Sequence, residues 1–126
     1  MIHTIQTSEN TVAFRALGQV TKEDYQTIVF PEASSLMKKI GEINFLILLD
    51  TDSTNATVDP WIENAVLELI KLGKWNKVAV VTDSEEVTAF ANRYSYVALE
   101  EFRIFNKKSF NKAIHWVEEE NKQPIL

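Results

Sequence analysis

Phe45-Leu46-Ile47-Leu48-Leu49 is an unbroken apolar run, and it decides the fold because it is typical of a strand buried on both faces. The run stops at Asp50, and a polar loop over residues 51–57 follows it. An amphipathic helix then begins near Asp59-Pro60-Trp61 and ends at Gly73. In α/β proteins, the loop between the carboxyl end of a strand and a helix N-terminus is a usual place for a site. The stretch therefore predicts the centre of a sheet and the first place to look for function.

The segments on either side of this strand predict the rest of an α/β domain. Short strands over residues 2–7 and 12–17 are separated by a turn-forming cluster, which indicates an antiparallel hairpin. A helix starts at the N-cap residue Thr21 and ends at Gly41, and Pro31 is expected to kink it or divide it in two. The later segments alternate: a buried strand over 77–82, a helix capped by Asp83 or Ser84, a short edge strand over 101–105 and a last helix that begins near Phe110. This alternation implies parallel pairing, so we expect a mixed five-stranded sheet with four main helices.

Composition limits the classes of function. The chain has 126 residues and a net charge of −5, which suits a single domain spanning residues 1–126. It contains no cysteine, so disulfides, thiol catalysis and thiolate metal sites are excluded. The basic residues are scattered, and the small group of Lys71, Lys74 and Lys77 is expected at solvated helix ends. An acidic domain without a long basic face is not expected to bind nucleic acid.

Several sequence signals are missing. The first residues lack the basic and apolar segments of a secretion signal, and the longest apolar run is far short of the ~18 residues that a membrane span needs. His3 and His115 do not belong to a metal-ligand spacing, and three glycines are too few for a glycine-rich phosphate loop. We therefore expect a cytoplasmic protein with no membrane span, no metal and no cofactor.

Two aspartates, Asp50 and Asp83, end neighbouring strands of the predicted parallel sheet. Their carboxylates are therefore expected near one another, where a pair of acids can share a proton and act in acid/base catalysis. The alternative interpretation is that each carboxylate caps the turn after its strand. No partner nucleophile is apparent, so capping is the favoured interpretation.

The segment that starts at Asp50 begins like a calcium-binding loop, with Asp50 as its first position, followed by Asp52, Thr54 and Asn55. Asn55 stands where such a loop has its sixth-position glycine, and Trp61 stands where it has the twelfth-position glutamate. Turn hydrogen bonds by short polar side chains are therefore favoured over a cation site.

Aromatic residues are the other candidates for a binding site. Tyr25, Phe30 and Trp61 lie on predicted helices, where such residues are usually part of the core. Phe30 precedes Pro31 and lies outside the main apolar stripe of its helix, so it is the least easily buried of the three. It is expected either to line a pocket under the kinked helix or to form a dimer contact.

Three segments together resemble the SpoIIAA-like protein family. Gly18-Gln19-Val20-Thr21-Lys22-Glu23-Asp24-Tyr25, followed by Pro31, is similar to the family's G-x-x-T-x-x-D-Y…P opening. Val78-Ala79-Val80-Val81-Thr82-Asp83 resembles its next buried strand. Its closing strand and helix are matched by Phe102, Phe105, Ala113 and Trp116. The resemblance implies a βα superhelix related to STAS domains and often grouped with lipid-binding CRAL-TRIO-type domains. It implies a fold more strongly than an activity.

The related anti-sigma-factor antagonists carry a phosphorylatable serine in an Asp-Ser-x-Gly motif, at the start of the helix after the central strand. Asp50 resembles the acid that ends that strand. The helix start here reads Thr57-Val58-Asp59-Pro60-Trp61-Ile62, with neither serine nor glycine, and the nearby hydroxyl residues Ser53 and Thr57 do not match the motif residue for residue. The phosphoswitch serine is therefore absent, and the resemblance does not imply a phosphoswitch.

Three hypotheses follow. The first is a non-catalytic binding or interaction module with an unknown protein partner, which forms a homodimer because sequential βα winding leaves part of one sheet face or an edge uncovered. The second is a carrier of a small apolar or lipid-like ligand. The third, and least favoured, is an enzyme that uses the strand-end aspartates. The candidate ligand-binding residues are Tyr25, Phe30, Trp61, Asp50 and Asp83.

Overall fold

The computed structural model describes residues 1–50, 58–94 and 101–119. They form one five-stranded sheet with the strand order β1-β2-β3-β4-β5. Its strands are β1 (Ile2–Ile5), β2 (Thr11–Leu17), β3 (Glu42–Asp50), β4 (Lys74–Val81) and β5 (Glu101–Phe105). β1 pairs with β2 antiparallel and every other pair is parallel, so the predicted mixed sheet with an N-terminal hairpin is confirmed.

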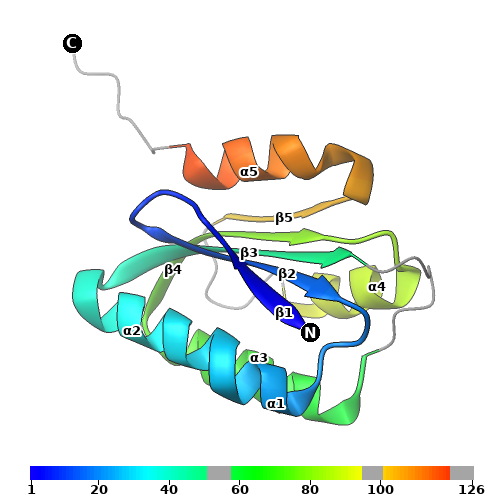
Figure 1. The fold of residues 1–126 in the computed structure, drawn as a ribbon, viewed down its shortest axis with the longest axis horizontal. Helices are drawn as coiled ribbons and strands as arrows, with labels where there is room; N and C mark the ends of the chain where they lie inside the picture. The colour runs from blue at the N-terminus through cyan, green and yellow to red at the C-terminus, as the bar shows by residue number, and fades with distance from the viewer. Residues whose placement is uncertain (51–57, 95–100, 120–126) are drawn as a thin grey trace.

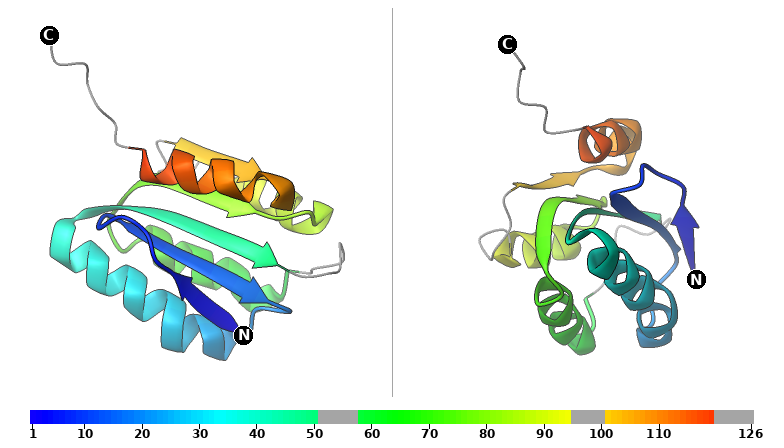
Figure 2. Two further views of the ribbon diagram at one scale, coloured as in Figure 1. Left: turned by 45° about the horizontal axis from the view of Figure 1, so that its top comes forward. Right: turned by 90° about the vertical axis from the view of Figure 1, so that its left-hand side faces the viewer.

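The helices cover the sheet on both of its sides. They are α1 (Lys22–Asp24), the π-helix η1 (Tyr25–Val29), α2 (Phe30–Ile40), α3 (Pro60–Ile70), α4 (Glu85–Tyr94), the short 3₁₀ helix η2 (Lys107–Ser109) and α5 (Phe110–Glu118). α1, η1 and α2 follow one another without a gap, on one side of the sheet, together with α3 and α4 (Figures 1 and 2). α5 lies on the opposite side. Strands added in one direction through right-handed crossovers place their helices on the same face, which explains the first group.

Pro31 is accommodated by a change of helix type. A proline has no N–H for the carbonyl four residues before it, and its ring crowds that carbonyl. The five residues of η1, which end two positions before Pro31, are π-helical, and Pro31 then lies in the first turn of α2. Thr21 caps α1 as predicted, because its hydroxyl accepts a hydrogen bond from the Asp24 N–H at 3.0 Å.

The core consists of two clusters, one on each face of the sheet. The cluster under α2 contains Phe14, Phe45 and Met37, and the cluster under α5 contains Leu46 and Val81. β3 contributes to both, which confirms that the apolar run is a central strand covered on both sides.

A buried polar network joins the three middle strands. Asn44 is 1% exposed and lies where the register between β3 and β4 shifts. Its Nδ2 donates to Thr11 Oγ1 at 3.3 Å, while its Oδ1 accepts from Asn76 Nδ2 and from the Lys77 N–H, each at 3.0 Å. The side chain of Asn44 therefore supplies the acceptor that the buried Lys77 N–H needs where the strand pairing is irregular.

Lys77 corrects one expectation from the sequence. It is 3% exposed on β4, and not at a solvated helix end. Its ammonium donates to the carbonyl oxygens of Trp116 at 3.1 Å and Glu119 at 2.9 Å, at the C-terminus of α5. A cation at this end of a helix satisfies free carbonyls and complements the helix dipole, which fixes α5 on the sheet.

Candidate ligand-binding cavity

The two faces of the central strands are covered to different extents. Adjacent residues of a strand point to opposite faces. On the α5 face, Leu46 and Val81 are fully buried, at 0% exposure. On the other face, Ile47 of β3 and Val80 of β4 are only half-buried. The helices on that second face therefore do not close over the sheet.

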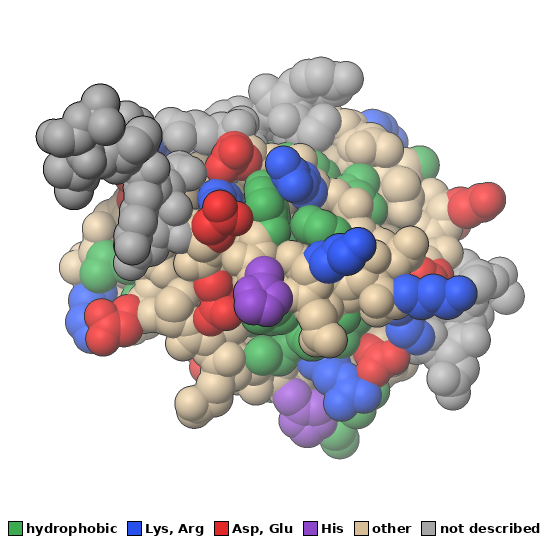
Figure 3. Space-filling model, turned by 90° about the horizontal axis from the view of Figure 1, so that it is seen from above, with side chains coloured by type: hydrophobic (Ala, Val, Ile, Leu, Met, Phe, Trp, Pro, Cys, Tyr) green, Lys and Arg blue, Asp and Glu red, His purple; other side chains and the backbone are tan. Residues whose placement is uncertain are grey.

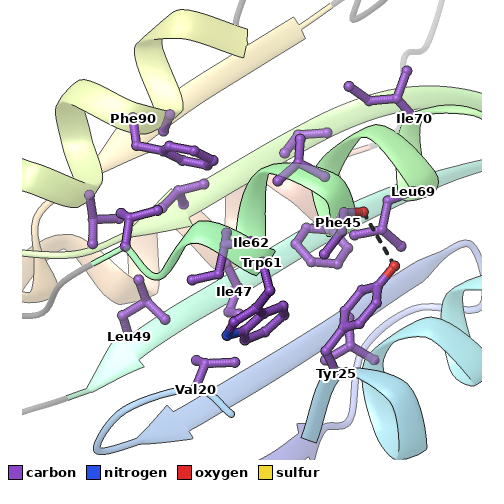
Figure 4. A pocket seen from close by; sticks show the side chains of 18 of the residues that line it. Val20, Tyr25, Phe45, Ile47, Leu49, Trp61, Ile62, Leu69, Ile70 and Phe90 are labelled. Atoms are coloured by element: carbon purple, nitrogen blue, oxygen red, sulfur yellow. Dashed lines mark hydrogen bonds between the residues drawn. The ribbon is translucent and has the colours of Figure 1, made fainter. Parts of the chain in front are cut away.

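A cavity of about 230 Å³ lies between this sheet face, η1, α3 and α4 (Figure 4). Its wall is almost entirely apolar and includes Val20, Phe45, Ile47, Leu49, Trp61, Leu69, Val78, Val80, Phe90 and Phe102. Gln19, Tyr25 and the tryptophans Trp61 and Trp75 are the lining residues that bring polar side-chain atoms. A concave, mostly apolar site with a few polar groups is typical of small-molecule binding.

Helix α3 carries a wide apolar stripe, and this cavity explains its width. Trp61, Ile62, Leu69 and Ile70 all line it and are all half-buried, and Ala65 is the one buried residue of the helix. The apolar stripe faces the cavity between the helix layer and the sheet. Its residues are therefore packed less closely than the residues between the sheet and α5.

Tyr25 fixes one wall of the cavity. Its hydroxyl donates to the Ala65 carbonyl oxygen at 3.2 Å, drawn dashed in Figure 4, and to the Glu68 carboxylate at 2.5 Å. Burial raises the pKa of the Tyr25 phenol, and the neighbouring Glu68 carboxylate raises it further. The phenol is thus held neutral, and it ties η1 to α3.

Trp61 and Phe30 have different positions around Tyr25. Both rings lie 5.9 Å from the Tyr25 ring, measured between centroids. Trp61 lines the cavity, whereas Phe30 is half-buried against the core cluster under α2 and is not among the lining residues. Of the three predicted aromatic residues, the structure therefore brings Tyr25 and Trp61 together at the cavity.

The strand-end aspartates lie outside the cavity wall and are held by basic residues and amides. The Asp50 carboxylate binds Arg15 Nε at 2.8 Å and Lys107 Nζ at 3.0 Å. Arg15, with Lys107 in addition, lowers the pKa of Asp50. Asp83 Oδ1 accepts from the Lys107 N–H at 2.9 Å. Lys107 thus links the two acids, and Ser84 caps α4 through the Val87 N–H.

Other predicted features fall partly outside the described residues. Asp52, Thr54 and Asn55 of the calcium-like loop, with Ser53 and Thr57, belong to the segment that the structure does not describe. Within residues 1–50, 58–94 and 101–119, no three His, Asp or Glu side chains gather as a metal site requires. The helices in these ranges are too short or too polar to span a bilayer.

The family model for SpoIIAA-like proteins matches residues 11–118. The chain belongs to the SpoIIAA-like family. Membership suggests a STAS-type interaction or regulatory domain in a family that is generally non-catalytic. No curated protein and no solved structure matches the chain.

Most lining residues of this SpoIIAA-like domain were not among the candidates from the sequence. Ile47, Val80 and Phe90 read as ordinary core residues, because a hydrophobic pattern gives the face of an element and not its distance from the next layer. The one available signal was the α3 stripe, which is wider than contact with a single layer needs.

Proposed function

We propose that this SpoIIAA-like domain is a non-catalytic binding module that holds a small apolar molecule between the sheet and helices α3 and α4. The observation that carries the proposal is the apolar cavity of about 230 Å³ beside a tightly packed second core. The proposal retains the binding module expected from the sequence, and it favours a small ligand over a protein partner.

The energetics of the cavity support this proposal. Unfilled apolar space in a core costs roughly 24 cal/mol per Å³, so the half-buried side chains around the cavity lose several kcal/mol of packing energy. Water molecules fill such a space poorly, because an apolar cavity offers them few hydrogen-bond partners. An apolar ligand recovers part of that packing and removes half-exposed side chains such as Ile47 and Val80 from water.

The contacts of Asp50 and Asp83 support the non-catalytic part of the proposal. Both carboxylates are engaged by Lys107, and Asp50 also by Arg15. Asp50 forms ion pairs at the end of β3, and Asp83 accepts a backbone hydrogen bond just after β4. Both carboxylates lie outside the cavity where a ligand would be held.

The homodimer stays a prediction without a defined surface. It was expected because part of one sheet face would be bare, but α5 covers that face over β3 and β4. Seen over α5, the surface carries acidic, basic and histidine side chains with only small apolar areas between them (Figure 3). The cytoplasmic location likewise stays a prediction.

Thermal unfolding with isopropylbenzene tests the proposed function. A ligand at a hundredfold excess over its Kd stabilises by about 2.7 kcal/mol, so the Tm of the wild type should rise by about 10 °C. Val80→Phe fills the cavity from the middle of β4 and should remove that rise.

The control is Val81→Ala, one residue along β4 and on the α5 face. It should lower the Tm but keep the full ligand-induced rise. A wild type that does not respond to isopropylbenzene, or a Val80→Phe variant that responds like the wild type, contradicts the proposed function.

A further inference from the structure

Trp61 presents a hydrogen-bond donor to the cavity. Figure 4 shows its indole between Val20 on one side and Ile47 and Ile62 on the other. In the described part of the chain, no group accepts a hydrogen bond from Trp61 Nε1. By contrast, Trp75 Nε1 donates to the Leu69 carbonyl oxygen at 2.8 Å. Because an indole N–H can only donate, its complement is an acceptor atom.

The charge around the cavity argues against an anionic ligand. The lining residues include no lysine, arginine or histidine. The Tyr25 hydroxyl donates to the Glu68 carboxylate, which is itself negative. Burying a carboxylate in apolar surroundings without a cation is costly, so an acid would leave its charged group outside.

The volume limits the size of the ligand. An apolar cavity of about 150 Å³ takes a benzene molecule. A cavity of about 230 Å³ therefore suits roughly nine non-hydrogen atoms, and it is too small for a whole long-chain lipid.

On the basis of the proposed function, we infer that the ligand is an uncharged molecule of this size that is apolar except for one acceptor oxygen, such as a ketone, aldehyde or ester. The carbonyl oxygen lies at the α3 N-terminal end of the cavity, where Trp61 Nε1 donates to it. The remaining atoms pack against Ile47, Val80 and Phe90.

Three probes of equal size test this inference: acetophenone has the acceptor, isopropylbenzene lacks it, and benzoate adds a charge. Trp61→Phe keeps an aromatic ring and removes the N–H. One neutral hydrogen bond corresponds to a three- to tenfold change in Kd. Trp61→Phe should therefore weaken the binding of acetophenone by that factor and change the Kd of isopropylbenzene by less than about twofold. Benzoate should bind at least tenfold more weakly than acetophenone.

The proton resonance of the Trp61 indole N–H gives a second readout. It should move downfield when acetophenone is added to the wild type, and not when isopropylbenzene is added. Equal weakening of both neutral probes by Trp61→Phe would mean that only ring packing matters and would overturn the inference, as would benzoate binding like acetophenone. In either case isopropylbenzene still binds, whereas failure of the proposed function removes its binding too.

Discussion

Leu46→Ala is expected to lower the free energy of unfolding by about 3–4 kcal/mol, and Ile47→Ala by only about 1–2 kcal/mol. The two residues are neighbours on β3 and lose a similar number of carbon atoms. Leu46 is fully buried between the sheet and α5, so its removal leaves a void that close-packed neighbours cannot fill. Ile47 already borders a cavity and has fewer contacts to lose.

Urea denaturation of both variants measures this difference, with the m-value checked to confirm two-state unfolding. Equal losses for the two variants, or a larger loss for Ile47→Ala, would show that the cavity face is packed as tightly as the α5 face.

Asn44→Ala is the second variant with a large expected effect, a loss of about 3 kcal/mol. The substitution removes hydrogen bonds to β2 and β4 at once. It also leaves the buried Lys77 N–H without an acceptor, and an unsatisfied buried donor costs about 1–3 kcal/mol by itself.

Asn76→Ala is the matched control for this variant. It removes a half-buried donor to the same Asn44 oxygen and leaves the Lys77 hydrogen bond in place, so it should cost about 1 kcal/mol or less. The same urea titration compares them. If Asn44→Ala costs no more than Asn76→Ala, the network does not hold the three strands together.

Much of the fold could be predicted from the sequence because its signals are local. The apolar run before Asp50 specifies a strand covered on both sides, and Thr21 specifies a helix start through its capping hydroxyl. Pro31 was expected to disturb its helix, and the π-helical turn before it is the form that the disturbance takes.

Tertiary features were harder to predict. Lys77 reads as a surface residue, because only the fold shows that the end of α5 lies over β4. Asn44 interrupts an apolar pattern without any sequence sign of the register shift that it satisfies.

The sequence offered two places for a site. One was the loop after Asp50, where related domains keep a switch serine, and the other was a pocket under the kinked first helix. The cavity lies between the sheet and α3 and α4, and Tyr25 of η1 is in its wall. Tyr25 and Trp61 were named in advance because they are large aromatic residues on helices. Asp50 and Asp83 were named for their places at strand ends, and the structure shows them bound to Arg15 and Lys107.

The most direct test of the central claim is a methyl-region NMR titration of the wild-type protein with isopropylbenzene. The methyl resonances of Ile47, Val80 and Leu69, which line the cavity, should shift and saturate together. Those of Leu46, Val81 and Val117, buried on the α5 face, should stay in place. Shifts confined to the α5 face, or no saturable shift on either face, would contradict the assignment of this cavity as a ligand site.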